Sequence, residues 1–251
     1  MPKIEIKNRD KLIICGLFLA KFDTLAYKSF AYKSLGFSSF IEAFNVLGFA
    51  LQGKPSNIKN YRDEFDPYFD NARKGWHQRE LRAYTKEIFE QYQNMEFEAF
   101  KNLISSFLIK DYELKQELSE FLDFKLETSF IKRIATGKAA ENYFLHNFKK
   151  HFANFNVLDV RKFGCGFDFK LTLENHQICV EVKGLNENKG QFLLTQKEFE
   201  MADRLKEKYC LFVIKNLKEK PMESLFFDPI KSFKFKKLEQ KIMQISYQGA
   251  V

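Results

Sequence analysis

Two short segments in the second half of the chain carry the residues best suited to catalysis. One contains Asp168 between two phenylalanines, and the other contains Glu181 and Lys183 in the sequence Val-Glu-Val-Lys. Apolar and polar residues alternate through both segments, which predicts two half-buried strands. Paired as a hairpin, they place two carboxylates and an amine on one face. That is a minimal set for holding a divalent cation against a phosphodiester.

The register of this hairpin is predicted from the alternation and from the polar residues between the strands. With Asn175 and His176 as the loop, Asp168 pairs with Lys183 and lies diagonal to Glu181. Diagonal neighbours are roughly 7 to 8 Å apart at the backbone, so both carboxylates can reach one cation. A hairpin whose charged face simply meets solvent would show the same pattern.

The order and spacing of these residues resemble the Asp...Glu-x-Lys core of the PD-(D/E)XK nuclease superfamily. The resemblance covers roughly residues 130 to 216, in five ordered segments at 137–141, 164–168, 180–184, 194–198 and 209–213. The same set is similar to a C-terminal domain found in restriction-type proteins of bacteria. The resemblance implies a core of helix, hairpin, helix and strand, with a mixed sheet flanked by helices.

The resemblance also implies roles for individual residues and Mg²⁺ as the cofactor. Asp168 and Glu181 would be the metal ligands, and Lys183 would stabilise developing charge or orient the attacking water. Glu141 lies early in an expected helix before the hairpin. It would border the metal site as a further catalytic candidate, or it is a surface glutamate favoured near a helix N-terminus.

A second helix and a buried strand are predicted after the hairpin. Thr195 and Glu198 match a capping box, which opens a helix ending near Lys208, and Lys197 is a candidate phosphate contact. The apolar run at 209–214 predicts a buried strand. Strand, helix and strand in this order form a crossover connection, so we expect a mixed sheet.

The first half of the chain predicts helices arranged like a helix-turn-helix. Ser39 and Glu42 match a capping box, and Ser56 can cap a second helix after the break at 53–55. The outer face of that second helix presents side chains able to contact phosphates or base edges: Asn57, Lys59, Asn60 and Arg62. An ordinary helical hairpin with a solvated face explains the same pattern.

A basic cluster follows, suited to contacts with a nucleic acid backbone: Arg73, Lys74, Arg79 and Arg82. The stretch around it resembles N-terminal segments seen in front of nuclease domains in restriction-type proteins. We therefore expect a helical DNA-recognition domain over residues 1–125 and a nuclease domain over residues 126–251. The lysine-rich segment 231–237 either lies against DNA or faces solvent, and we favour solvent.

Composition narrows the class of partner. The net charge of +8 favours a polyanion, such as nucleic acid or a membrane surface. The apolar run at 12–20 is too short to span a bilayer, so we expect a cytoplasmic protein that does not bind membranes. The four cysteines lack the spacing of a disulfide framework or zinc site. We assign the thirty phenylalanines mainly to the core.

These features predict an α+β or α/β protein that is a Mg²⁺-dependent, sequence-specific DNA endonuclease of type II restriction character. One chain offers one site, so cutting both strands of double-stranded DNA calls for a homodimer. A companion DNA methyltransferase is a possible partner. Three alternatives stay open: a repair or recombination nuclease that recognises DNA structure, a non-catalytic DNA-binding regulator, and a membrane-surface or protein-interaction role.

Overall fold

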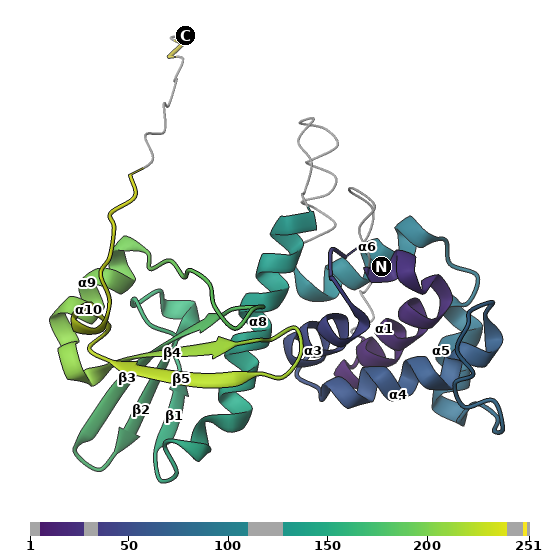
Figure 1. The fold of residues 1–251 in the computed structure, drawn as a ribbon, viewed down its shortest axis with the longest axis horizontal. Coiled ribbons are helices and arrows are strands. Elements are labelled where there is room, and N and C mark those ends of the chain that lie inside the picture. The colour runs from purple at the N-terminus through teal and green to yellow at the C-terminus, as the bar shows by residue number, and fades with distance from the viewer. Residues whose placement is uncertain (1–5, 28–34, 110–127, 240–247, 250–251) are drawn as a thin grey trace.

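The fold combines a helical half with a five-stranded sheet, and one long helix belongs to both. The computed structural model describes residues 6–27, 35–109, 128–239 and 248–249 (Figure 1). The long helix α8 (Thr128–Asn147) buries Ile131, Ala135 and Ala139 in the helical core and Phe144 in the sheet core. The predicted α+β class is confirmed. The domain boundary expected near residue 125 lies outside the described residues.

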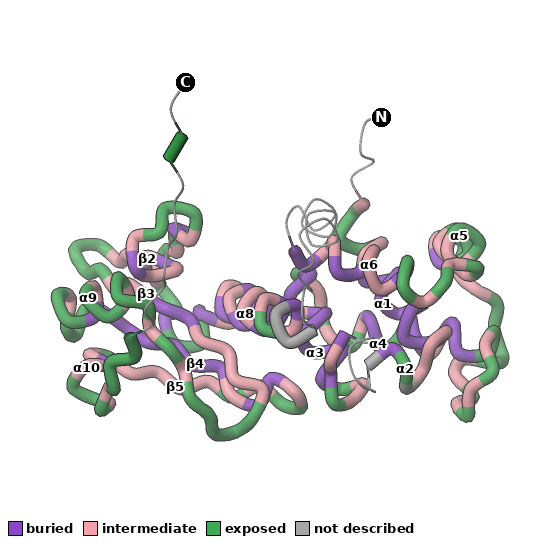
Figure 2. The backbone as a smooth tube through the Cα atoms, turned by 90° about the horizontal axis from the view of Figure 1, so that it is seen from above, coloured by how far each residue is buried: buried purple, intermediate pink, exposed green. Residues whose placement is uncertain are grey.

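The helical half is built around a buried central helix. All nine residues at 12–20 of that helix are buried, so the apolar run is a core element (Figure 2). Among the described residues, none of the helices is both long and apolar enough to cross a membrane. The elements of this half are α1 (Asn8–Phe22), α2 (Thr24–Tyr27), α3 (Phe40–Ala50), α4 (Pro55–Phe65), the 3-10 turn η1 (Asp66–Tyr68), α5 (Ala83–Tyr92) and α6 (Phe97–Leu108).

The two helices predicted as a helix-turn-helix are both present. Ser39 caps α3 as expected, because its hydroxyl accepts the N–H of Glu42 at 3.1 Å. The predicted cap at Ser56 is wrong: the N-cap of α4 is Lys54, two residues earlier, and its side chain makes no capping hydrogen bond. Proline suits the first helical position, where its ring presets φ and no N–H is needed. A recognition role for this pair remains a prediction.

The sheet has the strand order β1-β2-β3-β4-β5. Neighbouring strands are antiparallel except β3 and β4, which are parallel and joined by helix α9 (Gln196–Leu205) and the turn η4 (Lys206–Lys208). The predicted crossover, buried strand and mixed sheet are therefore confirmed. The strands are β1 (Asn156–Asp159), β2 (Phe169–Leu173), β3 (His176–Gly184), β4 (Tyr209–Lys215) and β5 (Met222–Phe227).

Aromatic packing holds α8 against the sheet. The Phe144 ring stacks on Phe169 of β2 at 4.9 Å between centroids, and meets Phe212 of β4 edge-on at 5.0 Å. Gly184 lets β3 approach α8 closely, since a Cβ there would lie 2.8 Å from the Ala140 Cβ. Short turns complete this half: η2 (Phe148–Lys150), η3 (Arg161–Phe163) and α10 (Pro229–Ser232).

The predicted hairpin forms, but its register is shifted by two residues. Phe169 pairs with Val180 and Leu173 with His176, so the loop is Glu174 and Asn175 rather than Asn175 and His176. Glu174 supplies the turn's left-handed backbone, with φ of 50°. A shift of two residues leaves every side chain on its predicted face. For this reason the alternation of apolar residues could not distinguish the two registers.

Candidate active site

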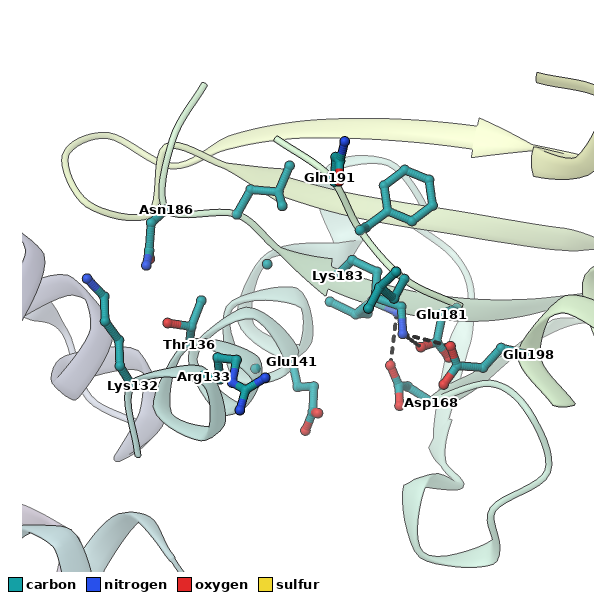
Figure 3. A pocket seen from close by; sticks show the side chains of 16 residues that line it. Lys132, Arg133, Thr136, Glu141, Asp168, Glu181, Lys183, Asn186, Gln191 and Glu198 are labelled. Carbon is teal, nitrogen blue, oxygen red and sulfur yellow. Dashed lines mark hydrogen bonds and ion pairs between the residues drawn. The ribbon is translucent and has the colours of Figure 1, made fainter. Parts of the chain in front are cut away.

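Asp168, Glu181 and Lys183 line one cavity of about 680 Å³ (Figure 3). Residues of α8 form one wall, the end of β3 forms another, and residues 191–193 line the cavity as well. The predicted convergence of the three side chains is therefore observed. It does not depend on the predicted pairing of Asp168 with Lys183, which the register excludes.

Two backbone contacts fix the position of Asp168 just before β2. Its N–H donates to the Val180 carbonyl oxygen at 2.9 Å, and its carboxylate accepts the Val182 N–H at 2.9 Å. The second bond draws the carboxylate to β3, next to Glu181 (Figure 3). Asp168 is thus held by the backbone of the strand that carries its two partners.

Lys183 links two carboxylates from different elements. Its Nζ lies 2.6 Å from Glu181 Oε1 and 2.7 Å from Glu198 Oε2. Residues two apart on a strand share a face, which is why Glu181 and Lys183 meet. Glu181 is only 4% exposed. The lysine therefore holds a fixed place between β3 and α9.

Glu198 is a site residue that the sequence indicated only as a helix cap. The predicted capping box is confirmed, since Glu198 accepts the Thr195 N–H at 3.1 Å and donates its own N–H to the Thr195 hydroxyl. The same Oε2 atom also contacts Lys183. The one signal in the sequence was that Glu198 lies in segment 194–198, the fourth of the five segments that carry the resemblance. The contact with Lys183 itself requires the crossover from β3 to α9.

Glu141 lines the same cavity from α8. It lies well inside that helix, which begins at Thr128, so the alternative role at a helix N-terminus is wrong. Its Oε2 pairs with Arg161 Nη1 at 2.5 Å, and Arg161 also pairs with Asp159 at 2.5 Å. The guanidinium stands 5.1 Å over the Phe169 ring. Arg161 therefore holds Glu141 at the edge of the site.

Burial and neighbouring charges shift the pKa values of Asp168, Glu181 and Lys183. Burial, followed by the charge of Asp168, raises the pKa of Glu181 to about 8. Burial also raises the pKa of Asp168 to about 6, although the hydrogen bond from the Val182 N–H acts to lower it. Burial alone would lower the pKa of Lys183, but Glu181 and Glu198 outweigh it and the pKa is raised. Lys183 thus keeps its proton, which favours charge stabilisation over a role as a base.

The far end of the cavity is polar and includes basic side chains. Lys132 and Arg133 project from α8, and Lys132 pairs with Glu42 of α3 at 2.8 Å. Two buried oxygens lining this end, Thr136 Oγ1 and Asn186 Oδ1, have no hydrogen-bond partner within the described part of the chain. The cavity therefore runs from a carboxylate cluster toward a region of positive charge (Figure 3).

Two of the predicted DNA contacts have structural partners instead. Arg62 does not lie on the outer face of α4: it is 9% exposed, pairs with Asp63 at 2.6 Å and stacks over Phe40. Arg73 pairs with Asp66 at 2.7 Å and with Asp23 at 2.5 Å. Helical spacing alone could not reveal Phe40, Asp66 and Asp23, because these partners lie outside α4.

The other predicted contacts are more accessible, and none of them lines the cavity. Lys59 is exposed and pairs with Asp63 at 2.7 Å, while Arg79 is exposed and lies 4.0 Å over the Trp76 ring. Arg82 of the basic cluster is bound to the buried Glu64. Asn57 is half-buried, and the remaining side chains are exposed: Asn60, Lys74 and Lys197.

The donor set limits which metal the site could hold. Across residues 6–27, 35–109, 128–239 and 248–249, no three His, Cys, Asp or Glu side chains are grouped as a metal site. Asp168 and Glu181 are two carboxylates that line the same cavity. That number suits Mg²⁺, which prefers oxygen ligands, takes few from the protein and retains water.

Comparison with known proteins gives one family match, which covers the half of the molecule that contains the sheet. Searches of curated proteins and of solved structures found no match. A family model described as "Protein NO VEIN, C-terminal" matches residues 140–227, a range that contains all five strands and the cluster of Glu141, Asp168, Glu181, Lys183 and Glu198. The chain is thus similar to the NO VEIN C-terminal domain over the part that forms its candidate active site.

Proposed function

We propose that this protein is a metal-dependent DNA endonuclease of the PD-(D/E)XK type. The observation that carries the proposal is the convergence of Asp168, Glu181 and Lys183 in one cavity. The order of α8, the β2-β3 hairpin, α9 and β4 supports it, because that order matches the core implied by the sequence resemblance. The basic net charge of +8 fits a nucleic acid substrate.

Asp168 and Glu181 are the proposed ligands for Mg²⁺. Burial is the main cause of the raised pKa values of both carboxylates, and the nearby charge of Asp168 raises the pKa of Glu181 further. A divalent cation between them would replace the bound protons and offset the repulsion between the two charges. When bound, Mg²⁺ would activate water and neutralise charge on the phosphate.

The surrounding residues would orient the reaction. Protonated Lys183 can donate to a phosphate oxygen as negative charge develops there. Glu198 fixes the direction of that amine from α9, and Val182 fixes Asp168 through its N–H. Arg161 restrains Glu141, the further catalytic candidate, at the border of the site.

We further propose type II restriction character, with the helical half reading sequence and a homodimer cutting both strands of the duplex. Asn57, Lys59, Asn60, Lys74, Arg79 and Lys197 remain the proposed DNA contacts. Arg62, Arg73 and Arg82 are withdrawn from that set because carboxylates already hold their guanidinium groups. A companion methyltransferase would protect the host DNA.

Digestion of phage DNA tests the proposal and separates it from its alternatives. Methylated and unmethylated DNA would be incubated with Mg²⁺ or EDTA, beside the Lys183→Ala variant. We expect discrete fragments only with Mg²⁺, native Lys183 and unmethylated DNA. Preference for branched DNA would favour the repair nuclease, and binding without cleavage, unchanged in Asp168→Ala, would favour the regulator.

A further inference from the structure

We infer that Lys231, Lys234 and Lys236 form a strip that binds the phosphate backbone of DNA beside the candidate active site. The name "lysine strip" refers below to these three residues. The inference deepens the proposed function and rests on it for the identity of the polyanion. It reverses the expectation that segment 231–237 faces solvent without a partner.

Lys231 lies in α10, and Lys234 and Lys236 are arranged by alternation in the extended segment that follows it. After α10 ends at Ser232, Phe233 has extended backbone angles, with φ of −127° and ψ of 150°. Phe233 and Phe235 are half-buried, whereas Lys234 and Lys236 are exposed. Because neighbouring side chains of an extended chain point to opposite sides, the phenylalanines face the protein and the lysines face away.

Aromatic contacts anchor this segment against three other elements. The Phe233 ring lies 4.7 Å from Phe226 of β5 and 5.2 Å from Phe192, measured between centroids. Phe235 lies 5.3 Å from Phe199 of α9 and 6.1 Å from Phe192. The chain accordingly runs past α9 after leaving α10 (Figure 1). The lysines are therefore carried on a segment with a defined place in the fold.

Phe192 connects the strip to the candidate active site. Its side chain lines the cavity that contains Asp168, Glu181 and Lys183. The same ring contacts Phe233 and Phe235, so a residue that lines the cavity is packed directly against the segment that carries Lys234 and Lys236. A DNA strand with one phosphate in the cavity would extend past this edge.

The charge of the strip is not neutralised within the described part of the chain. No carboxylate there forms an ion pair with Lys231, Lys234 or Lys236, unlike the guanidinium groups of Arg62 and Arg73. Lys197, exposed in the first turn of α9, lies two residues from the anchoring Phe199. Flexible ammonium groups suit sequence-independent contacts with phosphates. The strip would thus add affinity and position without reading bases.

Binding measured in EDTA tests the strip without requiring cleavage. The protein would carry Lys231→Ala, Lys234→Ala and Lys236→Ala together. A charge-matched control would carry Lys86→Ala, Lys149→Ala and Lys220→Ala, three exposed lysines elsewhere in the chain. Affinity for a labelled duplex would be followed by fluorescence anisotropy between about 50 and 200 mM salt.

The salt dependence gives the decisive readout. Each lost phosphate contact reduces the magnitude of the slope of log K against log salt by about 0.9. We therefore expect this slope to be smaller by about 2 to 3 in the strip variant than in the wild type. In the control variant the slope should be smaller by less than about 1. Equal slopes in the strip variant and the control would overturn the inference, as would wild-type binding to anionic vesicles but not to DNA.

The outcome is separable from that of the proposed function. A reduced slope in the strip variant would support the inference even if the wild-type protein never cleaves DNA. Metal-dependent cleavage together with an unchanged slope would overturn the strip and leave the nuclease proposal standing.

Discussion

Glu198 and Lys183 form an ion pair of 2.7 Å that joins the first turn of α9 to β3. The same carboxylate accepts the N–H of Thr195 and so completes the cap of α9. One side chain therefore starts a helix and positions the amine of the candidate active site. These two roles can be separated by mutation.

Glu198→Gln should impair cleavage more than stability. Glutamine can still accept the Thr195 N–H, since it serves in capping boxes, but it removes the charge that orients Lys183. We expect cleavage to slow by about 10-fold or more, in line with the loss of a positioned electrostatic partner. The single-turnover rate of DNA cleavage measures this effect.

Thr195→Ala is the matched control, because it weakens the cap and keeps the ion pair. It should lower the free energy of unfolding by about 1 kcal/mol while cleavage stays near the wild-type rate. If both variants lost stability and activity in parallel, the separate positioning role of Glu198 would be refuted.

The candidate site shows what the sequence could and could not predict. The alternation around Asp168 and Glu181 predicted the faces of the hairpin, because the period of two is a local property of strands. The register required knowledge of the turn at Glu174, and the contact of Glu198 with Lys183 required the crossover. Both depend on tertiary structure.

The sequence pattern also did not predict the two edge strands of the sheet. β1 and β5 lie at the two margins of the sheet and bury few side chains, so their alternation is weak. Arg62 shows a similar effect in the helical half. Its position on α4 indicated solvent, yet the Phe40 ring of α3 and the carboxylate of Asp66 lie against its guanidinium group.

Stability of the metal-free protein should fall as the pH rises through the site's titration range. The pKa values of Asp168 and Glu181 are raised on folding, to about 6 and about 8, so the folded state binds more protons than the unfolded state. By linkage, this contribution to the free energy of unfolding decreases from about pH 4, near the unfolded values, to about pH 8.

Urea denaturation in EDTA at several pH values would measure this contribution. The Asp168→Asn, Glu181→Gln double variant removes both titrations and should lose the decrease between pH 5 and pH 8. The difference between the two proteins isolates the site from the other titrating groups. A wild-type protein that gained stability relative to this variant over the same interval would contradict the electrostatic description.

Two glycines beside the cavity should respond oppositely to alanine. At Gly184 a Cβ would lie 2.8 Å from the Ala140 Cβ and 3.1 Å from the Thr136 carbonyl oxygen. Gly184→Ala should therefore cost about 1 to 3 kcal/mol by forcing β3 from α8. At Gly137, within α8, a Cβ would meet nothing within 4 Å. Gly137→Ala should stabilise by about 0.4 to 1 kcal/mol.

Thermal and urea unfolding of these two variants would test how closely α8 and β3 pack. The same sign of change in both would show that the close approach at Gly184 is not the limiting contact. Circular dichroism would confirm that the helical content is unchanged.

Arg62 and Lys59 lie on the same helix, but we expect Arg62 to contribute to protein stability and Lys59 to DNA binding. Arg62→Ala would leave the buried carboxylate of Asp66, 1% exposed, with less compensation and should cost about 2 kcal/mol or more. Lys59→Ala removes an exposed pair and should change stability by less than about 1 kcal/mol. Under the proposed function, Lys59→Ala instead weakens DNA binding.

Unfolding and DNA-binding measurements on both variants would decide this assignment. If Arg62→Ala kept full stability but lost DNA affinity, the guanidinium would belong to the recognition surface after all.

The most direct test of the central proposal is the rate of duplex DNA cleavage by wild type, Asp168→Asn and Asp203→Asn, each with Mg²⁺ and with EDTA. Asp203 is an exposed aspartate on α9 and controls for the same change of side chain. We predict cleavage by the wild type and Asp203→Asn with Mg²⁺ alone, and a loss of about 100-fold or more in Asp168→Asn. Cleavage that persists in EDTA, or that proceeds at the wild-type rate in Asp168→Asn, would contradict the account.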